Sequence, residues 1–218
     1  MEYLVAEQIP STFLSHLKTL KLRRIDNLKE IWNFSKIKTP CFTNLCEIDI
    51  YKSPKMKHVF PLSVAREFRQ LRSMEILDCE EMEEIIYNDG LQIMEENIAK
   101  VDESHTIVFP RLKTLKLEVM YKVKVFYDGN HAIELPSLEF LDIDDCNKME
   151  ALSYGSFYAP ILKEIGINRT SYYPTVGEDL NTFLKKALDA QMHIEEVEEE
   201  VIEENDNDNI DEIHQVVS

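Results

Sequence analysis

The chain has 218 residues, of which 44% are hydrophobic and 30% are charged, the composition of an ordinary folded protein. Only 5 residues are glycine, which disfavours glycine-rich nucleotide loops, and no segment approaches the roughly 20 apolar residues of a membrane-spanning helix. Of the 41 acidic residues, 12 lie in residues 187–218, which contain no Lys or Arg, so residues 1–186 carry 29 acids against 24 bases. Neither part has the basic surface that nucleic acids require, and we expect no nucleic acid and no membrane among its partners.

Residues 1–12 are interpreted as a lead-in segment, which lacks the basic start and the apolar core of a secretion signal. We therefore expect a cytoplasmic protein. The four cysteines, Cys41, Cys46, Cys79 and Cys146, have neither C-x-x-C nor metal-ligand spacing. We interpret them as reduced, structural residues.

One pattern of apolar residues, Leu-x-x-apolar-x-apolar, recurs six times within residues 13–172. The copies begin at Leu17, Leu45, Leu71, Leu112, Leu138 and Leu162. Four of the five intervals, 28, 26, 41, 26 and 24 residues, fall within the period of about 20–29 residues that defines leucine-rich repeats. Such agreement in register predicts a leucine-rich-repeat solenoid.

The spacing within each copy predicts the fold class. Apolar residues two apart point to one face of a strand, while the residue between them points to the other. A single repeat cannot bury these residues, whereas stacked repeats share one continuous core. We therefore expect an α/β solenoid in a horseshoe arc. It should have a parallel sheet of about six short strands on the concave face, and irregular loops and short helices on the convex face.

Two segments depart from the plain repeat. Residues 88–107 are polar, contain the turn signal Asn88-Asp-Gly and lack the leucine pattern, so we expect an insertion loop there. Ser63–Arg72 has apolar residues at helical spacing, which predicts a short helix on the convex side.

After the last repeat, residues 173–190 are predicted to form a capping helix. Its apolar residues fall on one stripe: Leu180, Phe183, Leu184, Ala187 and Leu188. A helix of this kind covers the end of a solenoid core, and a helix that binds a partner is the alternative interpretation. The acidic tail, residues 191–218, has too little apolar content to fold alone and is predicted to be disordered.

Several segments are more specific than a generic repeat. They are residues 61–65 (PLSVA), 79–86 (CEEMEEII), 109–117 (FPRLKTLKL), 125–129 (VFYDG) and 135–146 (LPSLEFLDIDDC). With Asp179-Leu-Asn before the final helix, they resemble the repeat domain of plant coiled-coil-type nucleotide-binding (NBS-LRR) disease resistance proteins over residues 13–190.

The resemblance implies a protein–protein recognition module of plant innate immunity. Its partners would be a pathogen effector, a guarded host protein or the nucleotide-binding domain of a receptor. The chain has no G-x-x-x-x-G-K-[ST], so we expect no nucleotide switch, no cofactor and a truncated form of such a receptor. Two alternatives remain open: a stand-alone adaptor, such as a substrate-recruiting subunit of a ubiquitin ligase, and a non-functional receptor fragment.

Binding is expected on the outward, concave side of the predicted strands. The candidate residues are Lys21, Arg23, Asp49, Tyr51, Glu75, Leu77, Lys116, Glu118, Phe140, Asp142 and Asp144. Lys21 with Asp49, and Glu75 with Lys116, should form a ladder of weak ion pairs between neighbouring strands. Exposed Tyr51, Leu77 and Phe140 beside unpaired acids would favour a basic, partly apolar partner.

We expect neither catalysis nor a metal site. The six histidines, at positions 16, 58, 105, 131, 193 and 214, form no metal-ligand spacing. No nucleophile elbow, dinucleotide-binding or kinase signature is present. No residue is therefore assigned a catalytic, cofactor-binding or metal-binding role.

Overall fold

The computed structural model describes residues 3–5, 14–32, 42–90, 106–174 and 180–190. The predicted acidic tail and most of the predicted insertion, residues 91–105, lie outside the described residues. Among the described helices, none is long and apolar enough to cross a membrane.

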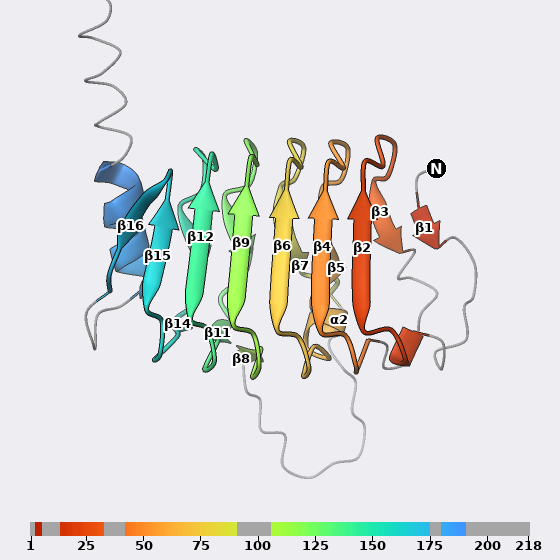
Figure 1. The fold of residues 1–218 in the computed structure, drawn as a ribbon, viewed down its shortest axis with the longest axis horizontal. Coiled ribbons are helices and arrows are strands. Elements are labelled where there is room, and N and C mark those ends of the chain that lie inside the picture. The colour runs from red at the N-terminus through yellow and green to blue at the C-terminus, as the bar shows by residue number, and fades with distance from the viewer. Residues whose placement is uncertain (1–2, 6–13, 33–41, 91–105, 175–179, 191–218) are drawn as a thin grey trace, which may run out of the picture.

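The front layer of the molecule is a seven-stranded sheet (Figure 1). Its first six strands are parallel, which confirms the predicted parallel sheet, and the seventh, β16, runs antiparallel to β15. In spatial order they are β2 (Thr19–Arg23), β4 (Glu47–Tyr51), β6 (Ser73–Leu77), β9 (Thr114–Glu118), β12 (Phe140–Asp144), β15 (Glu164–Ile167) and β16 (Thr170–Tyr172).

The leucine pattern sets the side-chain alternation of these strands. In β9, Leu115 and Leu117 are fully buried, while the three residues around them are partly exposed. The same alternation in β6 places Met74 and Ile76 opposite Leu115 and Leu117. The pairing of β6 with β9 therefore holds across the 41-residue interval, and the insertion leaves the sheet unbroken.

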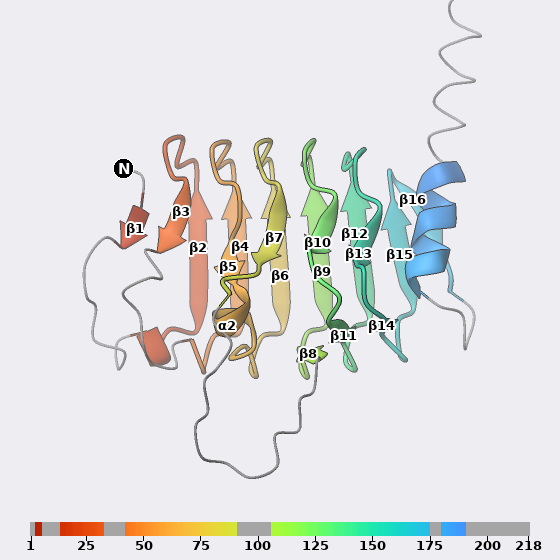
Figure 2. The ribbon, with the colours of Figure 1, turned by 180° about the vertical axis from the view of Figure 1, so that it is seen from behind.

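The back layer differs from the predicted loops and short helices, because it consists largely of short parallel strands (Figure 2). One sheet contains β5 (Phe60–Pro61), β7 (Glu84–Tyr87), β10 (Val125–Tyr127) and β13 (Ala151–Ser153), and another contains β8 (Thr106–Val108), β11 (Ala132–Glu134) and β14 (Phe157–Tyr158). The predicted convex helix shrinks to α2 (Leu62–Ala65). A strand advances about 3.3 Å per residue and a helix 1.5 Å, so an extended chain completes a short repeat with fewer residues.

The lead-in segment contributes to this back layer as well. Residues Tyr3–Val5 form β1, which pairs in parallel with β3 (Glu30–Trp32). The sequence contains the signal for this strand, since Met1-x-x-Leu4 repeats the spacing of Met82-x-x-Ile85 and Met149-x-x-Leu152.

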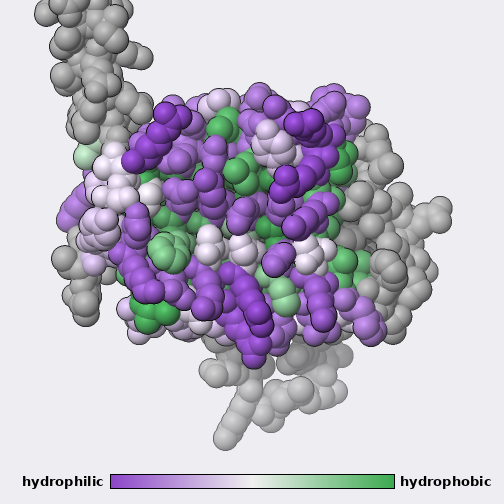
Figure 3. Space-filling model, viewed as in Figure 1, coloured by the Kyte–Doolittle hydropathy of each residue, from purple (hydrophilic) through white to green (hydrophobic). Residues whose placement is uncertain are grey.

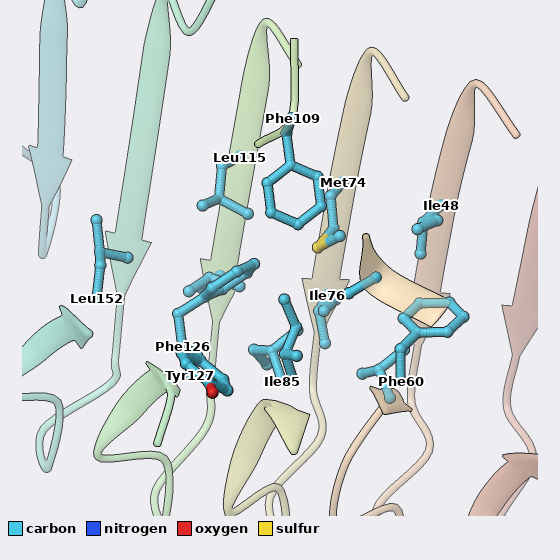
Figure 4. Packing of buried hydrophobic residues seen from close by; sticks show 14 of the residues in the cluster. Ile48, Phe60, Met74, Ile76, Ile85, Phe109, Leu115, Phe126, Tyr127 and Leu152 are labelled. Atoms are coloured by element: carbon cyan, nitrogen blue, oxygen red, sulfur yellow. The ribbon is translucent and has the colours of Figure 1, made fainter. Parts of the chain in front are cut away.

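A row of phenylalanines fills the space between the two layers (Figure 4). Phe60 and Phe68 meet edge to face with ring centroids 4.8 Å apart, and Phe68 also lies 6.4 Å from Phe109. Phe109 in turn packs against Phe126 of β10 at 6.4 Å. Because Phe60, Phe68 and Phe109 contact one another across successive repeats, the core is continuous along this part of the solenoid.

The helix at residues 180–190 lies at the C-terminal end of the sheets (Figures 1 and 2). Leu180, Leu184 and Ala187 of its apolar stripe are buried against the core. The Asn181 side chain donates to the carbonyls of Ser153 (3.1 Å) and Gly155 (2.8 Å) and accepts from the Leu152 N–H (3.3 Å). These bonds tie the helix to β13 and the turn that follows it.

Each of the first five front strands is followed by a residue with left-handed backbone, at the equivalent position of successive repeats. These residues are Arg24, Lys52, Asp78, Val119 and Asp145, with φ between 50° and 61°. The N–H of each of the first four donates to the end of the next front strand, as Val119 does to the Asp144 carbonyl at 3.0 Å. Asp145 donates instead to the side chain of Asn168, also at 3.0 Å. Val119 is the β-branched member of this series, and a left-handed conformation is least favourable for such a residue.

Replacing Val119 with Asn should therefore stabilise the protein, by about 1 kcal/mol, because Asn tolerates a left-handed backbone. Urea unfolding monitored by circular dichroism would measure the change. Asp145→Asn is the matched control and should change the free energy of unfolding by less than about 0.5 kcal/mol, since Asp already tolerates this conformation. A less stable Val119→Asn variant would contradict the assigned turn geometry.

Candidate protein-binding face

The outward side chains of the front sheet form three rows across the strands, and the pairing of the strands fixes which residues are neighbours. The first row is Thr19, Glu47, Ser73, Thr114, Phe140 and Glu164; the middle row is Lys21, Asp49, Glu75, Lys116, Asp142 and Gly166; and the third row is Arg23, Tyr51, Leu77, Glu118 and Asp144. All eleven candidate residues therefore lie on this one surface, in the order that the repeats predict.

The ion pairs on this surface differ from the predicted ladder. Asp49 pairs with Arg23 of the third row and not with Lys21. The Lys116 ammonium lies 3.1 Å from Glu118 and 3.2 Å from Asp142, and the nearby Glu75 carboxylate accepts a hydrogen bond from Ser73. Hydrogen bonding to Glu118, followed by that to Asp142, raises the pKa of Lys116. Long side chains reach diagonal neighbours as easily as opposite ones, so strand register alone does not determine the partner.

The predicted exposure of apolar side chains is correct for one residue of three. Phe140 is 46% exposed, whereas Tyr51 and Leu77 are only partly exposed. The Lys163 ammonium lies 5.8 Å from the centre of the Phe140 ring, within the range of a cation–π contact.

Three further large side chains are exposed on the segments that flank β15 and β16, and with Phe140 we call these four residues the apolar corner. Tyr158, Ile161 and Tyr173 are between 48% and 69% exposed. Phe140 is the register partner of Glu164 at the start of β15, Ile161 lies in the turn that leads into β15, and Tyr173 follows β16. The front surface in Figure 3 is mostly hydrophilic, with green areas at its lower left, over the beginnings of β12 and β15.

The sequence patterns identified Phe140 of the apolar corner but not its other three members, and the position of Tyr173 depends on the β15–β16 hairpin. In that hairpin Tyr172 pairs with Ile165 and packs against Phe183 of the C-terminal helix. Strand alternation then directs Tyr173 toward the outward side. The signal that could have found it is the Asn168-Arg169 turn, where both residues have positive φ.

The comparison with protein families decides the identity of these repeats. The family model of the leucine-rich repeats of plant disease resistance proteins of the RPS2-like type matches residues 2–80 and 68–165. The chain belongs to this family. A search of curated proteins and a search of solved structures give no significant match.

Acidic side chains predominate around β12 in this RPS2-like repeat domain. Asp142 and Asp144 follow Phe140 on the outward side, and Asp145 continues the series in the turn. The Lys116 ammonium forms ion pairs with both Glu118 and Asp142, so these two acids share one positive charge. An aromatic side chain therefore lies beside a locally negative surface.

Cys79 and Cys146 of the RPS2-like repeats are buried in the core beneath this face. Burial raises the pKa of Cys79 to about 11 and that of Cys146 to about 12. Both thiols therefore stay protonated at neutral pH and behave as small buried side chains. Within the described ranges, no group of three or more His, Cys, Asp or Glu residues is arranged to hold a metal ion.

One carboxyl group with a strongly raised pKa lies in the back layer. Burial, helped by the negative charge of Asp128, raises the pKa of Glu84 to about 7, against the effect of a hydrogen bond from the Asp128 backbone. The neighbouring Glu83 is exposed and bonds Lys57 at 2.7 Å, which lowers the pKa of Glu83. The folded structure therefore raises the pKa of Glu84 and lowers the pKa of Glu83, although the two residues are adjacent in the chain.

Glu84→Gln should raise the free energy of unfolding at pH 8 by about 1 kcal/mol, a value discounted for the partial exposure of the carboxylate. The folded pKa lies above the ordinary value of 4.5, so the stability given by the protonated group is complete below about pH 4.5 and is lost as pH rises through about 7. The variant should therefore differ little from the unchanged protein at pH 4.

Urea unfolding at both pH values measures this difference, and Glu83→Gln is the control. It should lower stability at pH 8, because it removes the carboxylate that pairs with Lys57. Equal effects of Glu84→Gln at pH 4 and pH 8 would show that Glu84 is not the buried carboxyl described here.

Proposed function

We propose that this chain is a protein-recognition module of plant innate immunity that binds its partner on the outward face of the front sheet. The partner would be a pathogen effector or a host protein that a receptor guards. The family supports the general role, because leucine-rich repeats of disease resistance proteins are interaction domains. We further propose that the chain acts in the cytoplasm, by binding and without catalysis.

The observation that carries this proposal is the exposed Phe140 ring, which has the acidic residues of β12 and the Lys163 ammonium as neighbours. A phenylalanine that is 46% exposed on a strand leaves apolar area in water, which a partner could cover. Tyr158, Ile161 and Tyr173 of the apolar corner are exposed as well. Large aromatic side chains of this kind are frequent at the energetic centres of protein interfaces.

The surrounding charges indicate what the partner carries. Asp142, Asp144 and Asp145 follow Phe140, whereas the basic side chains of β2, Lys21 and Arg23, lie four strands away. An apolar anchor flanked by Lys or Arg would fit the apolar corner and the acids of β12 together. The basic N-terminal strand would repel the same segment, which fixes its position along the sheet.

Alanine substitution of Phe140 should weaken partner capture by about tenfold or more, the effect of losing one interface anchor. Immobilised protein would capture partners from plant tissue with and without pathogen challenge, with quantification by mass spectrometry. Tyr121→Ala is the matched control, because Tyr121 is 48% exposed but lies in the turn after β9. Melting temperatures should confirm that both variants are folded.

Two outcomes would contradict the proposal. Equal losses for Phe140→Ala and Tyr121→Ala would mean that the apolar corner is not the binding surface. Unchanged capture by Phe140→Ala, with specific partners present, would place binding elsewhere on the chain.

A further inference from the structure

A groove of about 240 Å³ separates the C-terminal helix from the turns that follow β9 and β12. Lys124 and Lys148 of those two turns line it together with Lys185 of the helix. Met149 and Leu188 form its apolar part, and both pack against the hydrophobic core. The groove is thus apolar at its base and has an ammonium group from each of three separate segments.

These three lysines differ from most other lysines of the solenoid. Lys57, Lys113, Lys116, Lys122 and Lys163 each pair with a carboxylate at 3.2 Å or less. In the described part of the chain, no ion pair or side-chain hydrogen bond involves Lys124, Lys148 or Lys185. Glu150 and Asp189 also line the groove, which leaves it with an excess of positive charge.

The sequence contains a segment with the complementary chemistry. Residues 195–204 read EEVEEEVIEE, seven glutamates with three aliphatic residues, and no Lys or Arg occurs after Lys186. Val197, Val201 and Ile202 supply apolar side chains for Met149 and Leu188, while the glutamates supply carboxylates for the lysines.

The groove and this segment are also close along the chain. Three groove residues, Lys185, Leu188 and Asp189, lie in the helix described over residues 180–190, and four residues separate residue 190 from Glu195. Four residues span at most about 13 Å, so the acidic segment begins within that distance of residue 190. A segment tethered so closely has an effective concentration on the order of millimolar, so even weak ion pairs hold it.

We propose that this groove binds the chain's own acidic segment, residues 195–204, through Lys124, Lys148 and Lys185 over the apolar base. The contact is intramolecular and electrostatic, so salt weakens it and an external acidic ligand competes for it. It keeps the acidic segment at the C-terminal end of the solenoid, against the helix and the back layer. The groove thus recognises acidic sequences, whereas the apolar corner fits basic ones.

Zero-length carbodiimide coupling of the full chain, followed by peptide mapping, tests this proposal. At low salt, the three groove lysines should couple to Glu195–Glu204 about tenfold more than Lys18 and Lys21 at the far end of the sheet. About 0.5 M NaCl should remove most of this preference, because the screening length falls below the span of the ion pairs.

Replacing a lysine removes its own coupling site whether or not the acidic segment binds there. A double variant avoids this problem, because coupling is then measured at the third, unchanged lysine. Lys124→Gln with Lys185→Gln should reduce coupling at the unchanged Lys148 several-fold, since the three lysines hold one segment. Lys18→Gln with Lys21→Gln removes the same charge elsewhere and should leave Lys148 coupling unaltered. All four lysines are exposed, so both variants should melt like the unchanged protein.

Three results would overturn the proposal. The first is coupling of the acidic segment spread evenly over the exposed lysines. The second is Lys148 coupling that does not respond to the double variant. The third is coupling found only between chains and rising with protein concentration, which would assign the groove to a second copy.

Discussion

The inward leucines of a five-residue strand cannot be buried by the repeat that carries them, and the rest of the structure depends on this constraint. In β9, Leu115 and Leu117 are buried because β6 and β12 lie on either side and the phenylalanine row lies behind. Backbone groups are also satisfied by the neighbouring repeat. The N–H of the residue after each of the first four front strands donates to the carbonyl of the last residue of the next front strand. Stability therefore resides between repeats.

This arrangement frees the outward side chains from any role in packing. Lys116, Glu118 and Asp142 interact with one another at the surface, while the leucines beneath them keep the strands aligned. Phe140 can therefore be exposed at little cost to the fold. A surface of this kind can change its ligand without changing its frame, which suits the recognition role proposed here for the family to which the chain belongs. The groove beside the C-terminal helix adds a second proposed surface, which prefers acidic sequences where the apolar corner prefers basic ones.

The sequence predicted the strands that the leucine period marks, including the continuation of the sheet from β6 to β9 across the insertion. It did not predict the back strands, because the Met82-x-x-Ile85 spacing fits a loop or helical turn as well as a strand. Strand register predicted Lys21 as the partner of Asp49 and missed Arg23, because a long, flexible side chain can pair with any of several neighbouring residues. The position of Tyr173 in the apolar corner depends on the β15–β16 hairpin, whose turn consists of two left-handed non-glycine residues.

The most direct test of the repeat stacking is an engineered disulfide across the longest interval. Glu75 of β6 and Lys116 of β9 are register partners, and neighbouring strands lie about 4.8 Å apart, within the Cα separation that a disulfide allows. The double variant Glu75→Cys with Lys116→Cys should form this bond under mild oxidation, as peptide mapping would show. Glu75→Cys with Asp142→Cys, two strands apart, should not. Failure of the first pair, or equal formation of both, would contradict the stacking described here.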